Sequence, residues 1–171
     1  PVVNQALDRL ESATVLSRLL RVGDWLRLGF VLLLVLYALF VPAGVFEEGA
    51  FMEKFVNVLG GAALLLGGLL YVWAISHGPA GERWDRSVPR DLLRTGPYAY
   101  VQHPLWVAYL LTAIGMIFIL DAYIFVFLLL IIGMIYHHII EPAERHFLRK
   151  YFGEIFDQYC RATPRYIPRV L

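Results

Sequence analysis

Four long runs of apolar residues constrain this chain more than any other feature. They cover Leu28–Phe46, Phe55–Ile75, Leu105–Leu120 and Ala122–Tyr136. At about 1.5 Å per helical residue, the first two approach the ~30 Å hydrocarbon core of a membrane and the last two are slightly short. Of the 171 residues, 59% are hydrophobic and 17% are charged. So many apolar residues present more apolar surface than the core of one small soluble domain could bury. We therefore expect an all-α integral membrane bundle of about four transmembrane helices.

The last two apolar runs predict a helical hairpin near the C-terminus. Only Asp121 separates them, and Pro104 suits the first turn of the third helix. The fourth helix can extend through Ile140. Because Pro142 also suits a first turn, we expect the chain to bend at Glu141 and to continue as a separate C-terminal helix.

A stripe of apolar and aromatic residues at helical spacing follows this bend. This stripe predicts a buried or interfacial helix face that covers any pocket at the ends of the hairpin. Its members are Phe147, Leu148, Tyr151, Phe152, Ile155, Phe156 and Tyr159.

We expect the whole chain, residues 1–171, to form one domain. Residues 1–27 form an N-terminal interfacial segment with an amphipathic helix over Val2–Val22, residues 28–75 hold the first two transmembrane helices, and residues 76–171 hold a loop, the hairpin and a tail. No signal peptide is visible. Glycine pairs at 60–61 and 67–68 give the second helix small faces for close packing.

Positive charge lies on one side of the predicted bundle. Arginines cluster before the first run, between the second and third runs, and after the fourth run, whereas the first loop has Lys54 as its only basic residue and the hairpin tip has none. Cytoplasmic loops carry such an excess, so we expect both termini and the 76–101 loop in the cytoplasm. A net charge of +1 excludes a strongly basic nucleic-acid binder.

Polar residues concentrate in two stretches, 90–106 and 137–168, which flank the hairpin. Because an antiparallel hairpin brings its ends together, His103 and the 141–146 cluster should be neighbours. Pro104 leaves His103 at a helix start, where unpaired backbone N–H groups can hold a carboxylate. The alternative is that His103 only caps the helix.

Neither a metal site nor a cysteine nucleophile is predicted. His137 and His138 are adjacent, so they point to different helix faces, and no ligand spacing such as HExxH occurs. Cys160 is the single cysteine and has no histidine at useful helical spacing, which favours a free structural thiol.

The order and spacing of two motifs over Arg90–Pro168 resemble those of the isoprenylcysteine carboxyl methyltransferase and phospholipid methyltransferase superfamily. The first motif is matched by Gly96, Tyr98, His103 and Pro104. The second is matched by residues on the C-terminal side of the hairpin: Glu144, Phe152-Gly153, Phe156, Tyr159 and Pro164-Arg165…Pro168. The chain departs from the family pattern at Gln102 and Ile140, where the family has arginine, at Trp106, where it has tyrosine, and in the split acidic pair Glu141–Glu144.

The resemblance implies a small membrane enzyme that uses S-adenosylmethionine. The residues it implies for cofactor binding are Leu92, Leu93, Gly96, Tyr98, His103, Pro104, Glu141 and Glu144. Among the aromatic residues, Tyr98, Tyr100 or Trp106 can flank the adenine. His103 and Glu144 are also candidates for catalysis, and Arg145 is a candidate for orienting a polar group of the acceptor.

The methyl acceptor stays open between a lipophilic molecule, such as a prenylcysteine carboxylate or a phospholipid amine, and a small thiol or amine. Membrane lipids are the expected surroundings, and the sequence does not indicate an oligomeric state. Two other classes remain as alternatives: a membrane reductase of the sterol-reductase type that uses NADPH, and a non-catalytic membrane protein.

Overall fold

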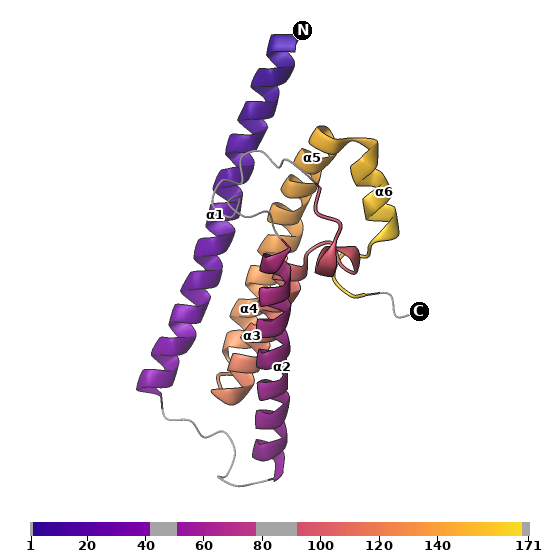
Figure 1. Cartoon of the computed structure of the whole chain (residues 1–171). Helices are drawn as coiled ribbons and strands as arrows, with labels where there is room; N and C mark the ends of the chain where they lie inside the picture. Colours follow the sequence, from indigo (N-terminus) through magenta and orange to yellow (C-terminus); the bar gives the residue numbers. More distant parts are fainter. Residues whose placement is uncertain (1, 42–50, 78–91, 169–171) are drawn as a thin grey trace.

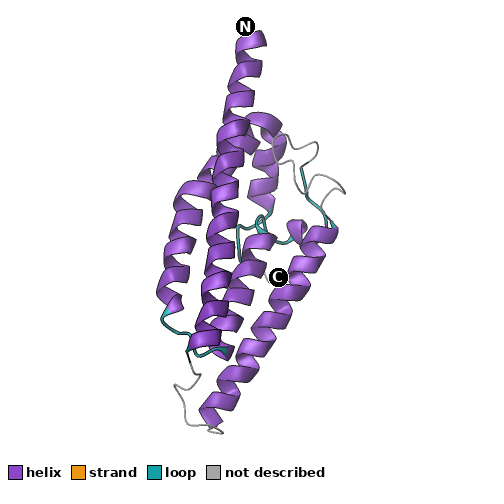
Figure 2. Cartoon of the chain, turned by 90° about the vertical axis from the view of Figure 1, so that its left-hand side faces the viewer, coloured by secondary structure: helices purple, strands orange, loops and turns teal. Residues whose placement is uncertain are grey.

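The described part of the chain consists of helices and the turns that join them. The computed structural model describes residues 2–41, 51–77 and 92–168. The elements in chain order are α1 (Val2–Phe40), α2 (Phe51–Ser76), the 3-10 turn η1 (Gly96–Ala99), α3 (Pro104–Ile119), α4 (Phe125–Ile135), the π-helical turn η2 (Tyr136–Ile140), α5 (Glu141–Phe152) and α6 (Glu154–Ala162). The long helices run roughly along one direction, and the described residues contain no strand (Figures 1 and 2). The expected all-α class is confirmed.

Within the described residues, three helical stretches are long and apolar enough to cross a membrane. They are Ser17–Phe40, Phe51–Ser76 and Phe125–Phe152. Helix α3 is also apolar, but its 16 residues extend only about 24 Å. Many large apolar side chains on these helices, such as Leu69 and Leu130, are exposed at the surface of the chain. A lipid bilayer accepts such a surface, so the expectation of an integral membrane bundle is confirmed.

Helix α1 is longer than the apolar run that predicts it. The structure joins the expected interfacial segment and the first span in one helix of 39 residues, about 58 Å long, whose N-terminal part extends beyond the other helices (Figure 1). No proline lies between 22 and 28 to separate the two parts. The helix ends at Phe40, just before Pro42, because proline disfavours a helical conformation in the residue that precedes it. The predicted end of this span, Phe46, lies outside the described residues.

Two of the four glycines predicted to give α2 a small face lie directly against α3. A Cβ atom added at Gly67 would stand 2.9 Å from the carbonyl oxygen of Ala108, and one added at Gly60 would stand 3.0 Å from that of Gly115. Added Cβ atoms at Gly61 and Gly68 would meet nothing within 4 Å. The packing face of α2 is therefore the Gly60–Gly67 side, where the two helix backbones approach closely.

The bend predicted at Glu141 is wrong. Helices α4 and α5 are joined through η2 into one helical stretch, Phe125–Phe152, and Glu141 itself has helical dihedrals (φ −60°, ψ −45°). Pro142 has no N–H to donate to the fourth residue before it, so it disrupts the regular hydrogen-bond ladder. A wider π-helical turn over Tyr136–Ile140 precedes the proline and keeps the backbone helical.

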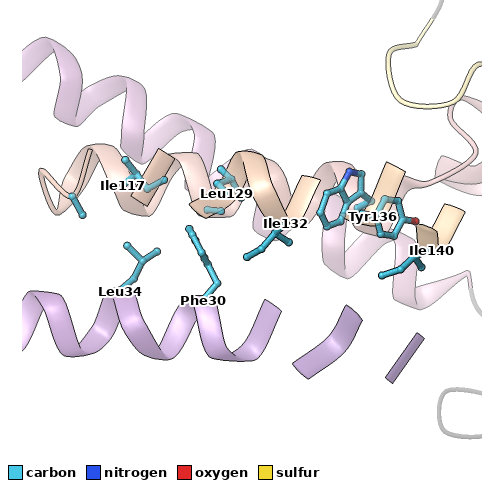
Figure 3. Close-up of a cluster of buried hydrophobic side chains, with 10 residues drawn as sticks. Phe30, Leu34, Ile117, Leu129, Ile132, Tyr136 and Ile140 are labelled. Atoms are coloured by element: carbon cyan, nitrogen blue, oxygen red, sulfur yellow. The ribbon is translucent and has the colours of Figure 1, made fainter. Parts of the chain in front are cut away.

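The buried core joins α1 to the hairpin. Figure 3 shows Phe30 and Leu34 of α1 facing Ile117 of α3 and Leu129 of α4, with Tyr136 farther along the same cluster. Phe30 and Leu34 are 1% and 0% exposed. Since one face of α1 supplies the residues that close the cluster, α1 holds the hairpin in place.

The C-terminal part folds back toward the start of α3. Gly153 has a φ of +57°, a left-handed conformation that favours glycine, and this residue separates α5 from α6 (Figure 1). The predicted aromatic stripe is therefore not continuous on one helix: Phe147 is buried beneath α5, and Phe156 and Tyr159 are buried beneath α6. The turn at Gly153 directs α6 back over the polar residues that flank the hairpin.

Candidate functional site

The hairpin brings His103, at the start of α3, beside Glu144 on α5. The Nδ1 atom of His103 lies 3.9 Å from a carboxylate oxygen of Glu144 and 3.2 Å from the hydroxyl of Tyr136. The ring of Tyr166 lies 5.8 Å from that of His103, measured between centroids. The expected proximity of His103 to the 141–146 cluster is thus confirmed. We call this region, with His103, Glu141, Glu144, Arg145 and Tyr166, the polar end of the bundle.

His103 is a neutral base near pH 7 although a carboxylate is close. Burial lowers the pKa of the imidazole below its usual 6.5, and the nearby charge of Glu144 opposes this effect only in part. The contact with Glu144 is therefore not a salt bridge at neutral pH. A neutral imidazole can accept a proton from a reacting group, and Glu144 would then stabilise the charged ring.

The two glutamates of the acidic pair have different surroundings. The side chain of Glu141 is 3% exposed and accepts a 3.0 Å hydrogen bond from Arg145, with His137 and Arg165 each 3.8 Å from its carboxylate. Glu144 is 28% exposed and faces His103. Glu141 thus acts within the protein to hold cationic side chains, whereas Glu144 is accessible to a ligand.

The start of α3 is covered by the C-terminal segment 163–168. The N–H of Gln102 donates to the carbonyl of Pro164 at 2.9 Å, and that of His103 donates to the carbonyl of Arg165 at 3.3 Å. Pro104 has no N–H, and the N–H groups of Trp106 and Val107 both donate to His103. The returning tail thus uses the N–H groups of Gln102 and His103, and the first turn itself uses those of Trp106 and Val107. The expectation that unpaired N–H groups at this helix start hold a carboxylate is not met at these four positions.

Gln102 connects three parts of the polar end. Its side-chain oxygen accepts a hydrogen bond from Arg145 at 3.1 Å, and its amide nitrogen donates to the carbonyls of Thr163 at 2.5 Å and Cys160 at 3.3 Å. Arg145 is thus held by Gln102 and Glu141 together. The sequence marked Gln102 only as a departure from the family pattern, and its central place in this network depends on the tertiary fold.

The turn that precedes α3 is fixed by Gly96. Its φ is +59°, and an added Cβ would lie 2.5 Å from the ring of His77, so a larger residue does not fit there. The carbonyl of Tyr98 accepts a 2.8 Å hydrogen bond from the hydroxyl of Tyr159, whose pKa is raised by burial, so the hydroxyl stays protonated as the donor. The half-buried Leu92 and Leu93 lead into this turn. The loop is therefore anchored to both α2 and α6.

The two aromatic candidates near α3 lie in different places. Tyr100 is 60% exposed, and its ring is 6.1 Å from that of Trp73. Both rings line an apolar pocket of about 300 Å³ that also reaches Val107 and Tyr166. Trp106, in contrast, is buried and stacked on Tyr136 with a centroid distance of 4.1 Å. Tyr100 is thus the accessible aromatic residue, and Trp106 forms part of the core.

Two tyrosines that the sequence reasoning did not single out contact His103. Tyr136 is the last residue of the fourth apolar run, and Tyr166 lies between Arg165 and Pro168 of the second motif. Their roles follow from the hairpin and from the return of the tail. Within 2–41, 51–77 and 92–168, no group of three or more potential ligand residues could hold a metal ion.

Comparison with known proteins adds a family to this geometry. Residues 55–155, more than half of the chain, match the phospholipid methyltransferase family. The chain is also 28% identical over 114 residues to the nickel-cobalt-cadmium resistance protein NccN of Alcaligenes xylosoxydans xylosoxydans, an alignment that covers 64% of this chain and 52% of that protein. The chain therefore spans about half the length of this curated relative. No solved structure matches the chain. Because the family match includes α2, the turn before α3, the hairpin and α5, the chain belongs to the phospholipid methyltransferase family.

Proposed function

We propose that this protein is a membrane methyltransferase that uses S-adenosylmethionine. The observation that carries the proposal is the accessible carboxylate of Glu144 beside the neutral imidazole of His103, within a segment that matches a methyltransferase family. The coarse class follows from the family. The cofactor, the acceptor and the residue roles are our proposal.

The residues at the polar end fit this cofactor. The carboxylate of Glu144 can accept hydrogen bonds from ribose hydroxyls, and the apolar pocket with Tyr100 and Trp73 offers flat aromatic surfaces for adenine. Since the N–H groups of Gln102, His103, Trp106 and Val107 already have acceptors, a cationic side chain is the better partner for the methionine carboxylate. The half-exposed Arg165 stands next to Glu141 at this end.

When bound, S-adenosylmethionine would supply a methyl group on a sulfonium sulfur. Methyl transfer breaks the carbon–sulfur bond and leaves its electron pair on sulfur, and a lone pair of the acceptor forms the new bond to the methyl carbon. His103 can take a proton that the acceptor atom loses. Glu144 stabilises the resulting imidazolium across the 3.9 Å between them. The buried walls around His103 exclude water and orient the reactants.

Binding of S-adenosylhomocysteine to the detergent-solubilised protein, followed by isothermal titration calorimetry, tests the proposal. We expect Glu144→Gln to weaken binding at least tenfold, because a neutral amide replaces an accessible carboxylate acceptor. Glu154→Gln is the matched control, since Glu154 is 80% exposed on α6 and pairs only at 3.6 Å with Arg161. Absence of binding to the unmodified protein would contradict the proposal, and binding of NADPH instead would support the reductase alternative.

We also propose that the polar end faces the cytoplasm. In the sequence, arginines gather in 18–27, before the first apolar run, and in 90–94 and 145–169, on either side of the hairpin, and such an excess is typical of cytoplasmic segments. The cofactor would then reach the site from the cytosol.

A further inference from the structure

Tyr136 is the residue of the buried core whose hydroxyl contacts His103. It belongs to the apolar cluster of Figure 3 and is 7% exposed. Its ring stacks on Trp106 at a centroid distance of 4.1 Å and stands nearly perpendicular to the ring of His103, with 87° between the two planes. Because this packing fixes the tyrosine ring, its hydroxyl keeps a defined place 3.2 Å from Nδ1 of His103.

The π-helical turn η2 brings Tyr136 and Glu144 to the same side of the helix. The N–H of Glu141 donates to the carbonyl of Tyr136, five residues earlier, so this turn holds one residue more than a regular α-helical turn. At about 100° per residue, side chains eight positions apart in a regular helix would point about 80° away from each other. The additional residue reduces this difference to about 20°, so both side chains face His103.

The polar contacts that the structure describes for the His103 side chain are both made by Nδ1. They join it to the hydroxyl of Tyr136 at 3.2 Å and to a carboxylate oxygen of Glu144 at 3.9 Å. A carboxylate only accepts hydrogen bonds and a hydroxyl oxygen can also accept them, so these neighbours favour a proton on Nδ1. The lone pair of the neutral ring is then on Nε2, at another corner of a side chain that is 13% exposed.

We propose that Nε2 is the reacting nitrogen of His103, and that Tyr136 is the positioning residue that, together with Glu144, keeps the other proton on Nδ1. The inference rests on the proposed function and concerns an acceptor atom that carries a proton. This atom bonds to the methyl carbon, its bond to hydrogen breaks with the electron pair left on the acceptor, and the proton goes to the lone pair of Nε2. The resulting imidazolium keeps its Nδ1–H directed to Tyr136 and Glu144. Tyr136 gains and loses no proton.

Two tyrosines that stack on Trp106 provide a test variant and its matched control. Tyr136→Phe removes the hydroxyl beside His103 and keeps the ring in the stack. Tyr109→Phe removes a buried hydroxyl that has no hydrogen-bond partner among the described residues, from a ring 5.3 Å from that of Trp106. Since both variants retain the aromatic ring, we expect both to fold, and the midpoint of thermal unfolding checks this.

The first measurement is the nitrogen-15 NMR spectrum of the full chain with labelled histidines, in detergent micelles at pH 8 and without cofactor. Chemical shifts of the ring nitrogens distinguish the two tautomers, and the spectrum of His103→Gln identifies the signals of His103 among those of the five histidines. We expect a single tautomer of His103, with the proton on Nδ1, in the unmodified protein and in Tyr109→Phe. Tyr136→Phe should show a mixture of both tautomers.

The second measurement is the transfer of radiolabelled methyl groups to total membrane lipids and small thiols. Tyr136→Phe should lower the maximal rate at least tenfold, because it removes the orientation of the base, and should leave the S-adenosylmethionine concentration for the half-maximal rate unchanged. Tyr109→Phe should change neither value. Titration with S-adenosylhomocysteine is expected to give the same affinity for all three proteins.

The possible failures are distinguishable. If S-adenosylhomocysteine binds to none of the proteins, the proposed function fails, and with it the role of Nε2. If it binds but His103 of the unmodified protein carries its proton on Nε2, or Tyr136→Phe transfers methyl groups at the full rate, the proposed function stands and the assignment of Tyr136 is wrong. Equal losses of rate in Tyr136→Phe and Tyr109→Phe would indicate a general effect on the packing around Trp106, and this would also overturn the assignment.

Discussion

His103 and Glu144 face each other at the polar end, but burial acts on them differently. His103 is enclosed by Tyr136, Tyr166 and the C-terminal segment, so its charged form loses hydration and its pKa falls. Glu144 keeps more than a quarter of its side chain exposed and can still meet a ligand. His103, a neutral base, thus lies beside Glu144, a carboxylate that can accept hydrogen bonds from a ligand.

The lowered pKa of His103 predicts a pH dependence of stability. As pH falls through about 6.5, the unfolded chain binds a proton at this residue before the folded protein does, so the free energy of unfolding decreases toward acid pH. The contribution of His103 is full above pH 6.5 and is lost progressively below it. We expect His103→Gln to flatten this dependence when the midpoint of thermal unfolding in detergent is measured from pH 5 to pH 8.

The control for this measurement is His146→Gln, because His146 is exposed on α5. It should retain the slope of the unmodified protein. Parallel curves for His103→Gln and the unmodified protein would contradict the assignment of a buried, neutral imidazole at 103.

At the scale of elements, two close contacts set the shape of the site: α2 against α3, and the C-terminal segment against the start of α3. The first depends on glycines that permit close approach of two helices. The second depends on backbone hydrogen bonds from Gln102 and His103 and on the side chain of Gln102. Both contacts hold the start of α3, which carries His103.

Neighbouring glycines on α2 should respond differently to substitution. Gly67→Ala places a Cβ 2.5 Å from the hydroxyl of Thr112 and 2.9 Å from a backbone carbonyl, so α2 and α3 must separate, with an expected loss of about 1–3 kcal/mol in the free energy of unfolding. Gly68→Ala has open surroundings and should be neutral or more stable by up to about 1 kcal/mol. Unfolding in mixed detergent micelles measures both, and equal effects would argue against the α2–α3 contact described above.

Removal of the Gln102 side chain should release the C-terminal segment. Gln102→Ala deprives Arg145 and the carbonyl of Thr163 of their hydrogen-bond partner, with an expected loss of about 1–3 kcal/mol and faster proteolysis after residue 162. Gln158→Ala is the control, because Gln158 is exposed on α6. If the two variants are cleaved at the same rate, Gln102 does not hold the segment.

At the scale of the whole molecule, the bundle has one end rich in polar groups and a hairpin tip without basic residues. α1 lies along the hairpin, and α5 and α6 cover the polar end (Figures 1 and 2). The water-soluble cofactor that we propose would reach His103 at this polar end.

The proposed orientation predicts the side of the membrane on which α6 lies. In a Cys160→Ser background, which removes the single cysteine, Gln158→Cys introduces an exposed thiol on α6. A membrane-impermeant maleimide should not label this thiol in intact cells and should label it once the cells are permeabilised. A cysteine at Lys54, an exposed position in the first turn of α2, should show the opposite pattern, and labelling of Gln158→Cys in intact cells would reverse the orientation.

Sequence alone determined the membrane class, the hairpin and the pairing of His103 with the acidic cluster. These depend on the length of apolar runs and on antiparallel connection through a short turn at Asp121, and both are local properties of the chain. Residues 90–168 also carried the family motifs from which the resemblance was drawn.

Tertiary structure decided how the polar end is assembled. The helix continues through Pro142 because the wider π-helical turn η2 accommodates the hydrogen bond that proline cannot donate. The turn at Gly153 divides the aromatic stripe and returns the tail to α3. That return occupies the N–H groups of Gln102 and His103 and encloses His103, and in the packed bundle Glu141 is buried whereas Glu144 stays partly exposed. Burial and hydrogen bonding between residues some sixty positions apart arise only when the chain is packed, so residue types and spacing do not specify them.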